Sequence, residues 1–298
     1  MPQVNRTSSP LIRIIIIIAL LLLAASLTTW WRLVHNNPTN VFKRMLATSL
    51  ATPAVSKRIH QVDDSQVLDQ VSALTAAPQQ AVRSLSVLQQ TGEVQTSITT
   101  ESIGTPTTDF VRYTDIHTTQ TNAGGKAFDF NSVLGLWGKS DPANPSSGDP
   151  QLFNQTVLGV VPLANVPQPQ RTQLLRQIND DKVYQLGADV KRQLVHGRPV
   201  YSYDVSVEPM AYVAMLKAFA RSLGITQLEQ VDPAQYADSE PLKFTFDIDV
   251  WSGQLTRVAY VGSERTETYG GYGARLQVEQ PASSIGIDEL QARLQQLQ

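Results

Sequence analysis

Two carboxylates stand two positions apart, at Asp247 and Asp249. Alternate residues of a strand share a face, so a strand over 242–251 would present both carboxylates together. Such a pair serves as acid and base in a glycosidase, but only within a cleft that divides the two roles. A calcium loop of the EF-hand type would need an oxygen ligand in place of Trp251 and a glycine in place of Ser252. We therefore interpret the pair as the solvent-facing side of a strand beside a hairpin.

The other residues that could do chemistry form no recognisable set. The four histidines, His35, His60, His117 and His196, are scattered and not spaced for joint metal ligation. The sequence contains no G-x-S-x-G, S-x-x-K or P-loop motif. It has no cysteine, which excludes disulfides, thiolate chemistry and a lipid-modified cysteine. We predict no catalytic residue, no metal site and no cofactor, and therefore no enzyme.

The pattern that points to a function is apolar and spread over several predicted strands. If the sheet that they form is curved, the apolar stripes would line its concave side. An apolar cavity binds greasy ligands by removing their surface from water, at about 25 cal/mol per Å². The residues expected to line the cavity are Phe128, Phe130, Leu134, Leu136, Tyr203, Val205, Phe244 and Phe246. The alternative is that helices fill the concavity and leave only a solid core.

Strands and amphipathic helices must position these side chains. Helical spacing of apolar residues predicts helices at 41–50, 170–178, 209–223 and 287–297. Alternation and β-branched or aromatic content predict strands at 55–62, 81–90, 94–103, 109–118, 126–138, 200–207, 242–251, 254–262 and 274–278, with two more inside 183–195. The segment 64–74 fits either type. The apolar segment 157–163 contains Pro162, which favours an edge strand or a loop beside the cavity mouth.

An apolar segment near the N-terminus bears on where the protein works. Ile14 to Trp31 carries no charge, and as a helix it would reach roughly 27 Å, close to the ~30 Å hydrocarbon layer of a bilayer. We predict a short cytoplasmic N-terminus at 1–10, a transmembrane anchor at 11–34 and a single extracytoplasmic α+β domain at 35–298. The expected location is therefore the cell membrane, with a single pass.

A cleaved signal peptide is the alternative to the anchor. Arg6 and Arg13 precede the apolar run, and Ala24, Ala25 and Ser26 are small enough for a cleavage site. Cleavage would make the protein secreted.

The fold class expected from these elements is α+β. It would consist of the N-terminal transmembrane helix and a curved, mainly antiparallel sheet, half-barrel-like, covered by a few amphipathic helices. The formal net charge of −2 provides no basic field for nucleic acid. The expected partners are the bilayer, a lipid ligand and an envelope protein.

The order of elements resembles a known class. A helix at 41–50 precedes several strands, a helix at 209–223 follows a strand, and a hairpin spans 247–258. This arrangement is similar to the envelope lipoprotein carriers of the LolA/LolB and LppX/LprG type. The resemblance implies a curved antiparallel sheet around apolar helices, often with a lipid-binding cavity. The missing lipid-modified cysteine departs from the class and argues against shuttling between membranes.

Two functions follow from the sequence. The first is a membrane-anchored extracytoplasmic binding protein whose apolar cavity takes a lipid or a lipidated envelope component. The second is an envelope interaction or sensor protein with a solid core, whose loops 139–150 and 269–273 would carry the contacts.

Overall fold

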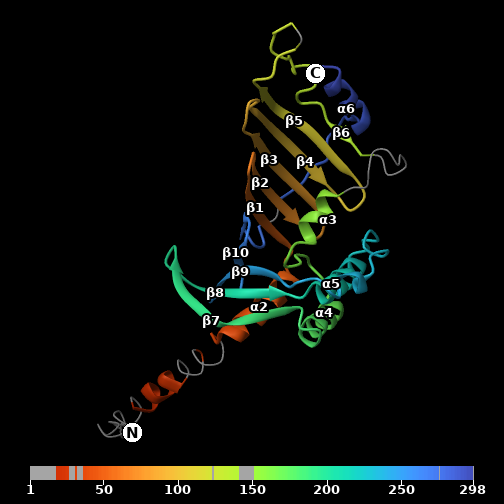
Figure 1. Cartoon of the computed structure of the whole chain (residues 1–298). Helices are drawn as coiled ribbons and strands as arrows, with labels where there is room; N and C mark the ends of the chain where they lie inside the picture. Colours follow the sequence, from red (N-terminus) through yellow and green to blue (C-terminus); the bar gives the residue numbers. More distant parts are fainter. Residues whose placement is uncertain are drawn as a thin grey trace, which may run out of the picture.

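The computed structural model describes residues 18–26, 31, 36–122, 124–140, 151–274 and 276–297. These residues form a large, curved, open sheet of twelve strands, with helices along one side and at its ends (Figure 1). The strand order is β12-β6-β5-β4-β3-β2-β1-β11-β10-β9-β8-β7. Every neighbouring pair is antiparallel except β12 with β6.

The strands and helices have the following bounds. The strands are β1 Ala54–Asp63, β2 Gln66–Thr75, β3 Ala81–Gln90, β4 Thr96–Gly104, β5 Asp109–Thr118, β6 Gly138–Lys139, β7 Tyr184–Val195, β8 Arg198–Val207, β9 Leu242–Asp249, β10 Leu255–Tyr260, β11 Glu264–Gly270 and β12 Ile285–Gly286. The helices are α2 Pro38–Ser49, α3 Leu152–Val157, α4 Gln168–Asp180, α5 Pro209–Ser222, the 3-10 helix η3 Pro233–Tyr236 and α6 Ile287–Gln295.

The sheet consists of two meanders that meet at β1 and β11. Strands β1 to β5 follow one another in the chain, and β7 to β11 do the same, so each half is built from neighbouring segments. The two halves join where Val62 of β1 pairs with Glu264 and Ser56 pairs with Gly270. A contact between residues about two hundred positions apart therefore makes one continuous sheet from two local units.

The main core lies between the β7–β11 half and the helices α2, α4 and α5. Asn37 caps α2 by accepting a hydrogen bond from the Thr39 amide at 2.9 Å, and Pro38 occupies the first turn, where its missing amide proton costs nothing. Met45 of α2 and Phe219 of α5 are completely buried in this core. We call the face of the sheet that these helices cover the inner face; it carries Val55 of β1.

The segment 157–163, predicted as an edge strand or loop, begins with the last residue of α3 and continues into the connection to α4. Val157, Val161 and Leu163 are buried in the main core. The hydroxyl of Tyr212 donates to the Gly159 carbonyl at 2.8 Å and that of Tyr184 to the Val160 carbonyl at 2.7 Å. Two tyrosines from α5 and β7 thus hold this segment against the sheet.

The prediction of a strand at 126–138 is wrong. Only Gly138 and Lys139 form a strand there, and 131–135 is a series of turns. Asp129 accepts a hydrogen bond from the Asn131 amide at 3.0 Å, and Gly135 has a φ of 78°, a conformation that glycine adopts without strain. The local polar contact and the glycine turn the chain, although the apolar residues alternate as in a strand.

The prediction of a transmembrane anchor at 11–34, and with it the single-pass membrane location, is contradicted. Within the described ranges, no helix combines the length and the apolar character needed to cross a bilayer. Apart from residues 18–26 and Trp31, the predicted anchor lies outside the described residues.

Candidate ligand-binding site

A cleft of about 820 Å³ opens between α2, α4 and the edge strand β7. This volume lies within the range of ordinary small-molecule sites. Its lining combines apolar side chains with a polar and charged margin. The apolar part consists of Phe42, Leu46, Leu175, Ile178, Tyr184 and Leu186. The polar part consists of Thr39, Lys43, Thr172, Arg176, Asn179, Asp180 and Lys182.

Each apolar wall follows from a helical or strand periodicity. Phe42 and Leu46 are one turn apart on α2, and Leu175 and Ile178 are three apart on α4, so each pair shares a helix face. Tyr184 and Leu186 alternate on β7. The cleft leaves Leu175 and Leu186 only half-buried, whereas Leu174 and Val183 beside them are buried.

An aromatic cluster forms the floor of the cleft. The ring of Phe42 lies 6.1 Å from that of Tyr184, 5.6 Å from that of Tyr203 and 6.2 Å from that of Phe246. The edge-on geometry of the two tyrosine contacts is a favourable arrangement for aromatic pairs. Burial, with a smaller contribution from Tyr212, raises the pKa of Tyr184 well above its ordinary value, so its hydroxyl stays a neutral donor. The floor is therefore uncharged and mainly aromatic.

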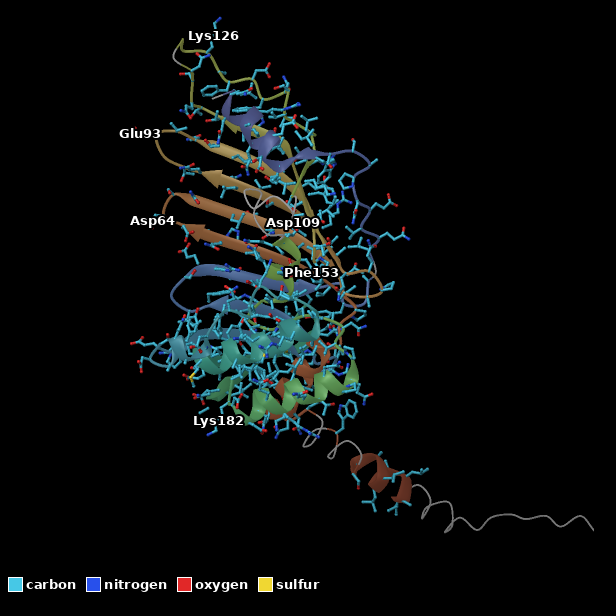
Figure 2. All side chains as sticks on the ribbon, turned by 90° about the vertical axis from the view of Figure 1, so that its right-hand side faces the viewer. Asp64, Glu93, Asp109, Lys126, Phe153 and Lys182 are labelled. Carbon is cyan, nitrogen blue, oxygen red and sulfur yellow. The ribbon has the colours of Figure 1, made fainter. Side chains whose placement is uncertain are left out.

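The margin of the cleft is predominantly cationic. Lys43 of α2, Arg176 of α4 and Lys182 after α4 line it, with Asp180 as the acidic residue. Among the described residues, none of the three cations forms an ion pair. Figure 2 shows Lys182 at the end of α4, at the lower edge of the folded body. A negatively charged group at the mouth would meet three positive charges and one negative charge.

The eight residues expected to line a cavity fall into two separate places. Tyr203, Val205, Phe244 and Phe246 are buried in the main core, where Tyr203 and Phe246 lie directly behind Phe42 of the cleft. Phe128, Phe130, Leu134 and Leu136 pack with α6 at the opposite end of the sheet (Figure 1). The structure therefore places two of the eight behind the cleft and two more in the same core, and it does not unite these four with the other four.

The lining residues of the cleft were not singled out from the sequence. The sequence does predict Phe42, Leu46, Leu175 and Ile178 as buried sides of helices. One signal was present: the apolar side of the predicted helix 170–178 carries three large residues, and only Leu174 and Ile178 of them are buried. The surplus residue, Leu175, faces the cleft.

The paired carboxylates Asp247 and Asp249 are buried, which corrects the interpretation as a solvent face. Asp249 accepts from Arg198 of β8 at 2.6 Å and from the amides of Trp251 and Ser252 at 3.0 and 2.8 Å. Asp247 meets Arg257 at 3.4 Å. The pair thus holds the β9–β10 turn and the β8–β9 contact. No cluster that could hold a metal ion occurs within the part of the chain that the structure describes.

Comparison with known proteins identifies a likeness of fold. No protein-family model matches the sequence, and no curated protein sequence does. The crystal structure of LprF from Mycobacterium bovis is similar at a TM-score of 0.43 and 13% identity, covering 82% of this chain and 96% of that one. The crystal structure of the Mycobacterium tuberculosis lipoprotein LppX is similar at a TM-score of 0.38 and 13% identity, and the match covers 82% of this chain and 100% of that one. The order of elements suggested a resemblance to the LppX/LprG type, and LppX is one of the solved structures to which this chain is similar.

Proposed function

We propose that this chain binds a single amphiphile in the cleft between α2, α4 and β7, without catalysing a reaction. The apolar part of the ligand lies against Phe42, Leu46 and Leu175, and its anionic head group meets Lys43, Arg176 and Lys182 at the margin. The observation that carries the proposal is the combination of an apolar floor with a cationic rim in one cleft of about 820 Å³.

The energies favour binding through the apolar part. Each methylene that leaves water contributes about 0.8 kcal/mol, so a chain of several methylenes gains more than a head group can. An exposed charge pair contributes only about 0.2–1 kcal/mol. The rim is therefore expected to select the head group, and the floor to supply the affinity. A lipid or a fatty acid has the required chemistry, and a lipid-binding carrier is the corresponding class of protein.

Fluorescence titration of the full chain with a dansyl-labelled fatty acid tests this proposal. We expect saturable binding with one site per chain. Leu175→Asp places a charge on the apolar wall and should weaken binding at least tenfold. Leu194→Asp is the matched control, because Leu194 is 75% exposed on the β7–β8 hairpin, outside the cleft lining, and its replacement should leave the affinity unchanged.

The rim has its own variant. Lys43→Glu should weaken binding of the fatty acid about two- to fivefold and leave that of the corresponding alcohol unchanged, because only the acid carries a charge. Absence of any saturable binding, or equal affinity of the Leu175→Asp variant and the unmodified chain, would contradict the proposal. Either result would favour an interaction protein with a solid core.

A further inference from the structure

A second hollow, of about 470 Å³, lies on the inner face of β1, β2 and β11, beneath α3 and the segment 158–160. Figure 2 shows α3, marked by Phe153, in front of these strands. We call this hollow the polar pocket. It shares no lining residue with the cleft. Its polar lining consists of Lys57, Gln70, Ser72, Gln155, Thr156, Tyr212, Tyr260, Arg265 and Glu267.

The sheet register places the charged side chains of the pocket side by side. Lys57 of β1 lies opposite Tyr269 of β11 on one side and Ser72 of β2 on the other, so the three share a row of the inner face. Ile59, which follows Lys57 by two positions on β1, lies opposite Glu267 of β11. Residues from three strands that are distant in the sequence are thereby assembled around one buried carboxylate.

Glu267 is completely buried, and its carboxylate is saturated with donors. One oxygen accepts from the hydroxyl of Tyr260 at 2.8 Å and from Arg265 at 2.7 Å. The other oxygen accepts from the hydroxyl of Tyr269 at 2.5 Å. Burial alone would raise the pKa of Glu267, but Lys57 and these three hydrogen bonds outweigh it and hold the pKa below its ordinary value. The carboxylate is therefore ionised, and two cations, Arg265 and Lys57, both face it.

The side chain of Lys57 is buried, and no hydrogen bond from its ammonium group is present among the described residues. Its side chain is 6% exposed, and its nitrogen lies 3.9 Å from Glu267, beyond hydrogen-bond distance. The Nε atom of Arg265 is likewise buried without a partner. Buried polar groups are nearly always hydrogen-bonded, because an unbonded one loses the water it left. With two cations, Lys57 and Arg265, around one carboxylate, the pocket keeps a net positive charge, and the Lys57 ammonium still has hydrogen atoms to donate to a ligand.

The wall opposite this charge offers hydrogen-bond acceptors. The hydroxyl of Ser72 donates to Ser84 at 3.0 Å, and the amide nitrogen of Gln70 donates to Ser84 at 2.8 Å. These bonds use the hydroxyl proton of Ser72 and one of the two amide hydrogens of Gln70, so the Ser72 oxygen and the Gln70 carbonyl can still accept hydrogen bonds. A ligand that fits this lining carries an anionic group for Lys57 and hydroxyl groups for β2.

We propose that the polar pocket binds a phosphorylated polyol, with its phosphate on Lys57 and its hydroxyl groups on Ser72 and Gln70. A phosphate offers several strong acceptor oxygens, and a charge-assisted bond to an ammonium is about twice as strong as a neutral one. The pocket volume is within the range of small-molecule sites. The ligand is either a soluble phosphorylated polyol or the head group of a phospholipid, since both present the same chemistry.

Calorimetric titration of the full chain with myo-inositol 1-phosphate tests the site, with myo-inositol as the uncharged comparison. We expect binding of the phosphate at least tenfold tighter than that of inositol. Lys57→Met removes the ammonium and should weaken phosphate binding at least tenfold. Gln155→Glu adds a negative charge at the exposed rim on α3, where folding is not at risk, and should weaken it about three- to tenfold.

The source of the ligand is decided with vesicles. Phosphatidylcholine vesicles with and without phosphatidylinositol are offered to the same full chain. Binding of the soluble phosphate indicates a site for a free compound. Binding of the phosphatidylinositol vesicles alone indicates a site for a lipid head group. In either case, Gln155→Glu should weaken the binding. Absence of binding in both arms, or binding that neither variant weakens, would overturn the proposal. Leu175→Asp, which alters the cleft, should leave phosphate binding in the polar pocket unchanged. A failure of the polar-pocket proposal can therefore be told apart from a failure of the cleft proposal.

The pH dependence of binding provides a second readout. Burial, only partly offset by Glu267, lowers the pKa of Lys57 below its ordinary 10.5. Of the described groups that face Lys57, the tyrosines 212, 260 and 269 and Arg265 have raised pKa values, and Glu267 has a lowered one. Above pH 7, affinity for the phosphate should therefore fall as pH rises through the pKa of Lys57. The Lys57→Met variant should show no such fall.

Discussion

The hydroxyl of Tyr184 donates a hydrogen bond to the carbonyl of Val160 at 2.7 Å. Tyr184 lines the apolar cleft from β7, and Val160 lines the polar pocket from the segment after α3. The two hollows are therefore separated by a wall that contains this partly buried hydrogen bond. A change in this bond should affect the segment over the polar pocket as well as the edge strand.

Tyr184→Phe should destabilise the protein by about 0.5–1.5 kcal/mol, because the partly buried Val160 carbonyl loses its side-chain partner. Urea unfolding measures the change. Tyr236→Phe in η3 is the matched control: its side chain is partly exposed, and no hydrogen bond from its hydroxyl is present in the described structure. Equal stability of the two variants would show that the wall does not depend on this bond.

The close packing of α3 on the sheet provides another prediction. A β-carbon on Gly104 would lie 2.9 Å from the backbone nitrogen of Phe153 and 2.8 Å from the β-carbon of Leu152. Asp109 accepts hydrogen bonds from the amides of Gln151 and Leu152 at 2.6 and 3.0 Å and so fixes the start of this helix.

Gly104→Ala should therefore displace α3, cost about 1–3 kcal/mol in urea unfolding and weaken binding in the polar pocket. Gly286→Ala is the control, since a β-carbon there meets nothing within 4 Å. If Gly104→Ala has the stability of the unmodified chain, α3 is not packed on β4 as described.

Glu101 should make stability depend on acid pH. It is buried on the outer side of β4 and pairs with Arg83 at 2.6 Å and Arg112 at 2.5 Å. Burial would raise its pKa, but the hydrogen bonds and charges of the two arginines outweigh it and lower the pKa below 4.5. A lowered pKa means that this stabilisation is complete above about pH 4.5 and is lost as pH falls through the folded-state value.

Thermal unfolding across pH 2 to 7 measures this contribution. Glu101→Gln should lower the melting temperature at pH 7 and have a smaller effect at the lowest pH. Glu93 is exposed, and Glu93→Gln should leave the melting temperature unchanged both at pH 7 and at the lowest pH. A constant difference between Glu101→Gln and the unmodified chain at every pH would rule out the linkage.

The separation of the two apolar clusters is also testable. Phe130 lies with Val133 and Leu290 in the cluster beneath α6, whereas Phe246 lies behind Phe42 in the main core. Replacement of either phenylalanine by alanine should cost about 3–5 kcal/mol. Only Phe246→Ala should weaken binding of the fatty acid in the cleft, because only this ring supports its floor. Weaker binding by Phe130→Ala would show that the clusters are coupled.

The sequence determined most individual elements. Helices at 41–50, 170–178, 209–223 and 287–297 correspond to α2, α4, α5 and α6, because the apolar spacing of a helix depends on residues within a few turns. The alternation at 242–251 likewise corresponds to β9. The segment 126–138 alternates as well, but a local turn at Asp129 and the positive φ of Gly135 prevail over that pattern.

Only the tertiary structure decided the sites. Whether Asp249 faces water depends on Arg198, which reaches it from β8. Whether Lys57 meets Glu267 depends on the pairing of β1 with β11, and the cleft exists because α2 and α4 meet without filling the space beside β7. Periodicity fixes which side of an element is apolar, since it is set by neighbours in the chain. Which sides face each other, and what space they leave, is set by contacts between residues far apart in the sequence, and no local pattern encodes these.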